Sequence, residues 1–186
     1  MSNKDIDLSR CLCYILRHNP SSAGVRVNEH GWAVIDELIS RVSAQGWEID
    51  RERLERIVRE DDKTRYSFSS DGTMIRCNHG HSITVDLELS ATQPPEVLLH
   101  GTGDVFVEAI RREGLISGAR MYVHLTEDRK VAMSVGGRHG KPVVFRVRSG
   151  EMARDGYEFF RSASGVWLTW AVPPKYLEPE AETEAL

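Results

Sequence analysis

Arg17 and His18 stand next to each other at the end of a predicted apolar helix. The helix face that precedes them carries Leu12, Ile15 and Leu16, and Asn19-Pro20 then stops the helix. Basic residues are favoured in a last helical turn because they complement the negative end of the helix dipole, so capping alone would explain the pair. If further arginines converge on these two residues, the cluster could instead bind phosphate through charge-assisted hydrogen bonds.

Two histidines in the second half of the chain lie on predicted strands. His100 ends the strand in "LLHGTG", and His124 lies inside "YVHLT". A single strand histidine is typically a hydrogen-bonded core residue. Two of them in one small domain favour a ligand site, and Gly101 and Thr102 would supply close backbone approach and a hydroxyl group.

The segment "CNHGH" offers an alternative chemistry, because Cys77, His79 and His81 alternate and could share one face of a strand. Zinc usually takes four ligands, or three and a water molecule. No fourth ligand is evident, and the basic surroundings disfavour a cation, so we expect no metal ion.

The elements that must position these residues form two groups. The first half predicts helices over 5–18, 32–43 and 50–60, the last capped by Asp50 with Leu54, Ile57 and Val58 facing inward. A hairpin over 65–77 follows, turning at Asp71-Gly72. Three helices and a hairpin are typical of a winged-helix lobe, which by itself would suggest DNA binding.

The second group follows a linker, 90–98, that contains two adjacent prolines. Strands are predicted over 97–101, 121–126, 142–147, 157–160 and 166–172, with helices over 104–114 and 127–137. The overall class is therefore α+β, with a lobe over 1–92, a second small α/β lobe over 93–178, a cleft between them, and an acidic flexible tail over 179–186.

Composition and the absence of standard motifs exclude several classes of function. The formal net charge of the 186 residues is −4, and without Glu178, Glu180, Glu182 and Glu184 near the end of the sequence it would be zero, which argues against bulk electrostatic binding of long nucleic acid. Neither a signal-peptide core, a membrane span, a G-x-G-x-x-G loop nor a Walker A loop occurs. The three cysteines, Cys11, Cys13 and Cys77, lack zinc spacing and indicate a reducing, cytoplasmic location.

Seven motifs in order resemble one family, the tRNA 2′-phosphotransferases (KptA). They are "LSRCLCYILRH", "DDKTRYSF", "IRCNHGHS", "LLHGT", "ARMYVHLT", "RHGKPVVFRV" and "GVWLTWAVPPKYL", and they cover residues 8–177. The resemblance implies a winged-helix lobe that binds RNA and the 2′-phosphate, followed by an ADP-ribosyltransferase-like lobe that binds NAD as co-substrate. It also implies removal of an internal RNA 2′-phosphate through an ADP-ribosylated RNA intermediate, with release of nicotinamide and ADP-ribose 1″,2″-cyclic phosphate.

The resemblance also implies roles for individual residues. The catalytic quartet would be Arg17, His18, Arg65 and Arg120, with Arg120 entering from the NAD-binding lobe to stabilise the charged phosphorus centre of the second step. The residues that would contact or support NAD are His100, Gly101, Thr102, His124 and Thr126. Further RNA or phosphate contacts would come from His81, Ser82, Arg138 and His139, although Arg138 and His139 could equally be a solvated loop.

Some positions depart from the family pattern, namely His79, Tyr122, Ser164 and Thr126. None belongs to the quartet, so the departures leave the reaction in place and affect fine RNA or NAD contacts. We expect a monomer without a metal or membrane partner. Two alternatives stay open: a winged-helix nucleic-acid binder that has lost catalysis, and a protein or DNA-end ADP-ribosyltransferase that stops after the first step.

Overall fold

The computed structural model describes residues 2–179, which form two compact units. Unit 1 contains the chain up to Leu89 together with Ala119–Met121 and Ser162–Ser164. Unit 2 contains Ser90–Gly118, Tyr122–Arg161 and the chain from Gly165 onward. Two short segments of the second half of the sequence thus belong to unit 1.

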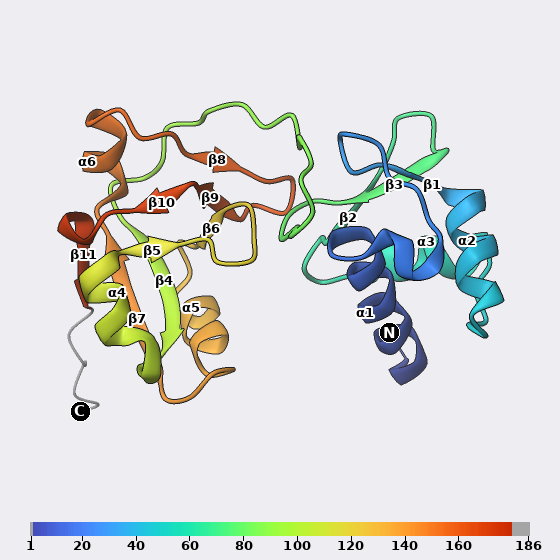
Figure 1. Ribbon diagram of the computed structural model, residues 1–186, viewed down its shortest axis with the longest axis horizontal. Helices are drawn as coiled ribbons and strands as arrows, with labels where there is room; N and C mark the ends of the chain where they lie inside the picture. The colour runs from blue at the N-terminus through green and yellow to red at the C-terminus, as the bar shows by residue number, and fades with distance from the viewer. Residues whose placement is uncertain (1, 180–186) are drawn as a thin grey trace. The chain divides into compact units, whose positions relative to one another are not determined.

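Unit 1 combines helices with one small antiparallel sheet (Figure 1). In chain order its elements are α1 (Asn3–Arg17), η1 (Pro20–Ala23), β1 (Ala33–Val34), α2 (Ile35–Ala44), α3 (Arg51–Arg59), β2 (Tyr66–Phe68) and β3 (Met74–Cys77). The strand order is β1-β3-β2. The apolar faces of the three α-helices and the sheet share one core, which includes Leu12, Leu38, Leu54 and Ile75.

The three predicted helices and the hairpin of unit 1 are confirmed, with shifted ends. Helix α1 starts at Asn3, because Ser2 and Asp5 form a reciprocal capping box ahead of it. Asp50 accepts a hydrogen bond from the Arg53 amide and caps α3, as predicted. The hairpin turns at Gly72, whose φ of +69° is the left-handed conformation that glycine adopts without strain.

Unit 2 contains three small sheets and three α-helices within the described residues. Its elements are β4 (Leu98–Gly103), η2 (Asp104–Phe106), α4 (Val107–Glu113), β5 (Leu115–Ile116), β6 (Val123–Leu125), α5 (Arg129–Gly136), β7 (Pro142–Val147), α6 (Ser149–Arg154), β8 (Phe160–Arg161), β9 (Trp167–Thr169), β10 (Ala171–Val172), η3 (Pro174–Tyr176) and β11 (Leu177–Pro179). The sheets have the orders β11-β7-β4, β6-β9-β8 and β10-β5, and every pair is antiparallel.

The sequence pattern missed part of unit 2. It predicted two helices there, but "SGEMAR" forms a third, α6, whose six residues are too few to show a helical period. The predicted strand over 166–172 is divided into β9 and β10, which pair in different sheets. Of the predicted tail 179–186, Pro179 pairs with β7 in strand β11 together with the preceding Glu178, and residues 180–186 lie outside the described residues. The α+β class is confirmed.

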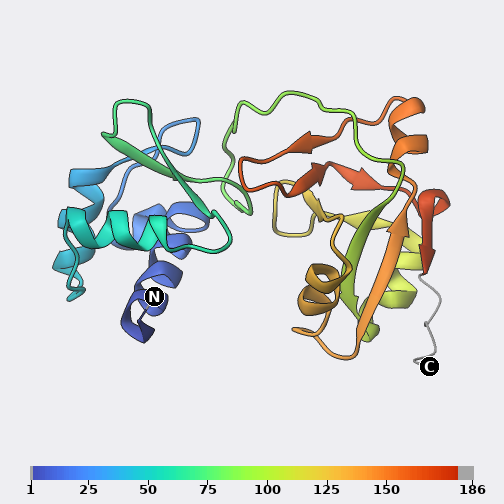
Figure 2. The ribbon, with the colours of Figure 1, turned by 180° about the vertical axis from the view of Figure 1, so that it is seen from behind.

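Helix α5 packs against strands β4 and β7, as Figure 2 shows from behind. The contact is close because glycines face the backbone of the neighbouring element. A Cβ atom at Gly101 would lie 1.7 Å from the Ala132 carbonyl oxygen, and one at Gly136 would lie 2.6 Å from the Thr102 carbonyl oxygen. No described helix is long and apolar enough to cross a membrane.

Candidate active site

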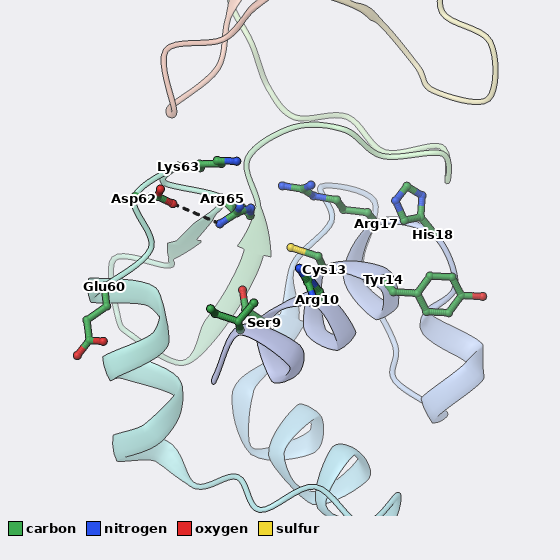
Figure 3. Close-up of a pocket in the computed structure, with 11 residues that line it drawn as sticks. Ser9, Arg10, Cys13, Tyr14, Arg17, His18, Glu60, Asp62, Lys63 and Arg65 are labelled. Carbon is green, nitrogen blue, oxygen red and sulfur yellow. Dashed lines mark ion pairs between the residues drawn. The ribbon is translucent and has the colours of Figure 1, made fainter. Parts of the chain in front are cut away.

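A cavity of about 620 Å³ lies in unit 1, between α1 and the loop that follows α3 (Figure 3). Its lining residues are Ile6, Ser9, Arg10, Cys13, Tyr14, Arg17, His18, Glu60, Asp62, Lys63 and Arg65. Four of these carry a permanent positive charge and two carry a carboxylate. The excess of positive charge suits an anionic ligand.

Arg17 lies at the last position of α1 and contributes its guanidinium group to the cavity wall. The Arg17 carbonyl accepts hydrogen bonds from the backbone amides of Ser82 and Ile83, at 3.0 and 3.3 Å, so backbone groups cap this helix end. The Arg17 Nε and Nη2 atoms are buried and have no hydrogen-bond partner among the described residues. Burial lowers the pKa of this guanidinium, but its electrostatic interactions with the Cys77 and Cys13 side chains outweigh that effect and raise it.

His18 is exposed and forms the C-cap of α1. Its Nδ1 lies 2.9 Å from the Ser82 hydroxyl, and its ring centroid lies 6.2 Å from that of Tyr14. Burial of part of the ring lowers the His18 pKa, and the charges of Arg17 and Arg120 lower it further. The imidazole is therefore mainly neutral at pH 7 and able to accept a proton.

Arg65 enters the cavity from the residue before β2 and is held by a buried carboxylate. The Asp61 side chain, 1% exposed, accepts hydrogen bonds from both the Arg65 Nη1 and the Arg65 backbone amide. Asp62 lies 3.9 Å from the same guanidinium but is 81% exposed. Figure 3 shows the Arg17 guanidinium extending over the Cys13 sulfur toward Arg65, whose guanidinium is joined to Asp62 by a dashed line.

Arg120 and His81 belong to unit 1 but do not line this cavity. The segment Ala119–Met121 belongs to unit 1, where the Met121 amide donates a hydrogen bond to the His81 carbonyl oxygen at 3.1 Å. The predicted lobes, 1–92 and 93–178, put Arg120 in the second lobe, whereas the segment around it belongs to unit 1. Arg120 is exposed, and its charge lowers the pKa of His18. The four residues of the predicted quartet all lie in unit 1, although Arg120 does not line the cavity.

His81 is 2% exposed, and neither of its ring nitrogens has a hydrogen-bond partner among the described residues. Burial is the main reason why the His81 pKa falls to about 4, with smaller contributions from the charges of Arg17, His18 and Arg76. Its ring is thus kept neutral at pH 7. The backbone around it, including the Ser82 amide, holds the end of α1.

The alternative metal site of Cys77, His79 and His81 is not assembled. Strand β3 ends at Cys77, so the two histidines lie beyond it and do not share a strand face. The His79 Nδ1 lies 2.8 Å from the Ser164 hydroxyl. Residues 2–179 contain no group of three or more histidine, cysteine or acidic side chains able to hold a metal ion.

In unit 2 the two predicted histidines are neighbours. The His100 Nδ1 donates a hydrogen bond to the His124 carbonyl oxygen at 3.1 Å, and the His124 Nδ1 donates to the Tyr122 carbonyl oxygen at 3.0 Å. Because carbonyl oxygens only accept, the neutral form of each ring carries its lone pair on Nε2. The backbone thereby sets the tautomer of both histidines.

The other residues predicted to contact NAD also contribute to packing and to backbone hydrogen bonds. The space that a side chain would need at Gly101 is filled by the Ala132 carbonyl, so the close approach predicted there is made by α5. Thr102 is buried, and the Thr126 hydroxyl accepts a hydrogen bond from the Asp128 amide ahead of α5. Thr126 also pairs through its backbone with Leu99, which joins β4 to the end of β6.

Arg138 and His139 lie in the exposed turn after α5 in unit 2. The His139 amide donates to the Gly136 carbonyl oxygen, and its ring centroid lies 6.2 Å from that of Phe106 in an edge-on arrangement. The structure therefore places this pair on the surface of unit 2, whereas His81 and Ser82 belong to unit 1.

Three residues of the site were not predicted. Cys13 precedes Arg17 by four residues and so lies on the same face of α1, a spacing that could have indicated it. Asp61 and Tyr66 come from loop and strand positions without a periodic signal. The Tyr66 hydroxyl donates a hydrogen bond to the Ser9 carbonyl oxygen at 2.6 Å and lies 3.0 Å from the Cys13 sulfur.

Comparisons with known proteins identify the family of this chain. Residues 3–171 match the family model described as RNA 2′-phosphotransferase, Tpt1 / KptA family. A protein named "Probable RNA 2′-phosphotransferase" from Flavobacterium johnsoniae is 45% identical over 92% of this chain and 94% of its own length. Relatives of the same name from Agrobacterium fabrum and Pseudomonas syringae pv. tomato are 46% and 42% identical, covering 95% and 98% of this chain and 95% and 99% of their own lengths. The chain belongs to the RNA 2′-phosphotransferase, Tpt1 / KptA family, and is a transferase.

Proposed function

We propose that this enzyme removes an internal 2′-phosphate from RNA, of the kind found at a tRNA splice junction, with NAD as co-substrate. The observation that carries the proposal is Arg17, whose buried Nε and Nη2 lack a partner at a cavity that Arg65 also lines. A phosphate dianion would accept hydrogen bonds from these groups and neutralise the excess positive charge. In this proposal unit 1, with its helix, strand, helix, helix and hairpin order, is the winged-helix lobe that binds the phosphate.

Unit 2 is proposed as the ADP-ribosyltransferase-like lobe that binds NAD, in the cytoplasm. The residues fit this co-substrate because two imidazoles with set tautomers and a buried threonine hydroxyl lie on β4 and β6. His100, with Thr102, would contact the adenosine side, and His124 would support the pocket. Gly101 would contribute through the packing of α5. When bound, NAD supplies an electrophilic ribose carbon, C1″, from which nicotinamide can depart.

The proposed reaction has two steps. In the first, an oxygen of the RNA 2′-phosphate attacks C1″ and nicotinamide leaves, which gives an ADP-ribosylated RNA phosphate. In the second, the ribose O2″ attacks phosphorus, which gives RNA with a 2′-hydroxyl and ADP-ribose 1″,2″-cyclic phosphate. Arg17 and Arg65 hold the phosphate during the first step, when correct placement matters most.

The second step places the largest demand on the basic residues, because negative charge accumulates on a crowded phosphorus centre. Arg17, Arg65 and Arg120 would stabilise that charge. His18, mainly neutral at pH 7, would accept the O2″ proton, and Ser82 would orient its ring through Nδ1. This division of roles needs no metal ion.

The arginines of α3 do not form the free basic face that a duplex-binding winged helix would use. Arg51 Nε lies 2.6 Å from Glu55, and Arg53 Nε lies 2.8 Å from Asp5, which Arg56 also approaches at 3.6 Å. These ion pairs neutralise positive charge that duplex DNA would otherwise attract. The structure thus favours a phosphate-binding role for unit 1 over that of a general DNA binder.

The proposal is tested by incubating the protein with a 2′-phosphorylated oligonucleotide, with and without NAD, and identifying the products by mass spectrometry. We expect loss of the 2′-phosphate only with NAD, together with nicotinamide and ADP-ribose 1″,2″-cyclic phosphate. Release of inorganic phosphate without NAD would show that the proposed use of NAD is wrong.

Variants separate the two steps. Removing one donor to a developing oxyanion slows catalysis about 100- to 1000-fold. Arg120→Ala and Arg65→Ala should therefore slow the second step more than the first, and ADP-ribosylated RNA should accumulate as a slower gel band. His100→Ala should raise the NAD concentration required and accumulate no intermediate. If Arg120→Ala left only unreacted RNA, or turned over at the wild-type rate, its role would be wrong.

A further inference from the structure

Two of the three cysteines meet at the wall of the unit 1 cavity. Cys13 lines the cavity from α1 and is half-buried, whereas Cys77, the last residue of β3, is completely buried. The Cys77 and Cys13 side chains pack in the same core of unit 1. The Tyr66 hydroxyl, from the strand position opposite Cys77, lies 3.0 Å from the Cys13 sulfur. Both thiols are free.

The charges around this pair favour a negative Cys13. The hydrogen bond from Cys77 is the main reason that the Cys13 pKa falls to about 6, and Arg17, Tyr66 and Arg65 add to it against the opposing effect of burial. Burial raises the pKa of Cys77 well above its usual value. At pH 7 the pair therefore consists of the Cys13 thiolate, which lines the cavity, and the Cys77 thiol, which donates a hydrogen bond to that thiolate.

Such a pair combines an attacking sulfur with a second sulfur in contact with it, as oxidation-sensitive cysteine pairs do. Cys11, two residues before Cys13, differs in every relevant respect. It does not line the cavity, and burial raises its pKa, whereas the pKa of Cys13 is lowered. The chain thus contains its own control thiol.

We propose that Cys13 is an oxidation site at the phosphate cavity, attacked by hydrogen peroxide and resolved by Cys77 as a disulfide. The Cys13 sulfur attacks one peroxide oxygen, the O–O bond breaks, and hydroxide leaves and takes up a proton as water, which leaves a sulfenic acid. The Cys77 sulfur then attacks the Cys13 sulfur, the S–O bond breaks, and a second water leaves. Two thiols and one peroxide give one disulfide and two waters.

The disulfide would change the candidate site, and this consequence rests on the proposed function. It removes the thiolate charge beside Arg17 and ties α1 to β3 at Cys13, four residues before Arg17 and five before His18. Since 1 Å of misplacement can cost about 100-fold in rate, oxidation should inactivate the enzyme. A thiol reductant should restore activity, because a disulfide is reversible.

The first test measures thiol reactivity against pH with 4,4′-dithiodipyridine, a neutral reagent that the cationic cavity does not attract by charge. Wild type, Cys13→Ser and the matched control Cys11→Ser are compared. At pH 6 about half of Cys13 is thiolate, against about 0.1% of a thiol with a pKa of 9, so the thiolate fractions differ about 500-fold. A thiolate of lower pKa is a weaker nucleophile, which reduces the expected difference in reaction rate to about 20-fold. We expect a fast phase of that size with a midpoint near pH 6, absent in Cys13→Ser and retained in Cys11→Ser. A fast phase that survives in Cys13→Ser, or a midpoint above pH 8, overturns the proposal.

The second test treats the protein with stoichiometric hydrogen peroxide and maps the products by peptide mass spectrometry. The expected product is a Cys13–Cys77 disulfide in wild type and in Cys11→Ser. In Cys77→Ala the Cys13 sulfenic acid should persist and be trapped by dimedone. Oxidation of Cys11 before Cys13, or a stable sulfenic acid in wild type, refutes the assignment.

Neither test requires RNA or NAD, so both can succeed even if the proposed reaction is wrong. A third measurement joins them: the oxidised wild-type protein is assayed for 2′-phosphate removal before and after dithiothreitol. We expect a loss of at least 10-fold, reversed by the reductant. Full activity of the disulfide form contradicts the inferred effect on the site, whereas an inactive reduced protein refutes the proposed function alone.

Discussion

The ion pair of Arg65 with Asp61 gives a prediction about how burial changes the contribution of a carboxylate to stability. Two neighbouring carboxylates approach the same guanidinium: Asp61 is 1% exposed and also accepts the Arg65 backbone amide, whereas Asp62 is 81% exposed and lies 3.9 Å away. Asp61→Asn keeps the shape of the side chain and removes its charge. Hydrogen bonds to charged groups contribute about 1.5–3 kcal/mol, so we expect a loss of about 2–3 kcal/mol in the free energy of unfolding. Asp62→Asn, which removes an exposed ion pair, should cost at most about 0.5 kcal/mol.

The effect on turnover should follow the same order. Without the Asp61 carboxylate, Arg65 loses the group that fixes its side chain, and a displacement of about 1 Å can cost 100-fold. We expect single-turnover removal of the RNA 2′-phosphate to slow about 10- to 100-fold in Asp61→Asn and less than 2-fold in Asp62→Asn. Stability would be measured by urea denaturation followed by tryptophan fluorescence. Equal effects of the two substitutions, or an Asp61→Asn variant that is destabilised yet turns over normally, would show that Asp61 does not position Arg65.

Three further predictions concern the rest of the molecule. His81 is buried, and its pKa of about 4 lies below the value of 6.5 in the unfolded chain, so the free energy of unfolding of unit 1 should fall by about 3 kcal/mol as the pH falls from 6.5 to 4. A His81→Gln variant should lose that part of the pH dependence in urea titrations, and an identical dependence of the free energy of unfolding on pH in the two proteins would contradict this. Gly101→Ala should prevent stable packing of α5 on β4, because its Cβ would lie 1.7 Å from the Ala132 carbonyl oxygen, whereas the control Gly137→Ala, with 3.4 Å to its nearest neighbour and φ of −63°, should fold normally by circular dichroism and thermal melting. Activity should survive EDTA, since arginines supply the positive charge; loss of turnover restored by zinc or magnesium would refute this.

The amino-acid sequence determined the three α-helices and the hairpin of unit 1, but it missed strand β1, Ala33–Val34, which lies within the predicted helix 32–43. The three helices have clear apolar periods, Asp50 is a good N-cap, and Asp71-Gly72 specifies a tight turn, so short-range signals suffice there. The basic character of the candidate site was also visible, because Arg17, His18, Arg65 and Arg120 lie within recognisable family motifs. Family membership could therefore be predicted from the sequence alone.

Unit 2 was less predictable, because its elements are short and their identity depends on partners distant in sequence. Strands of two or three residues, such as β5 and β10, exist only because they pair with each other. Gly101 illustrates the same limit. A glycine beside a strand histidine suggested space for a ligand, but tertiary packing fills that space with the backbone of α5.

The chemical state of the candidate site was decided by tertiary structure alone. No spacing in the sequence shows that Cys77 donates to Cys13, that Asp61 holds Arg65 or that the segment around Arg120 belongs to unit 1. The reason is physical: charge and pKa depend on burial and on neighbours within a few ångströms, and folding brings those neighbours together from several parts of the chain. The sequence determined which groups are present, and the fold decided which of them carry a charge and which lack a partner.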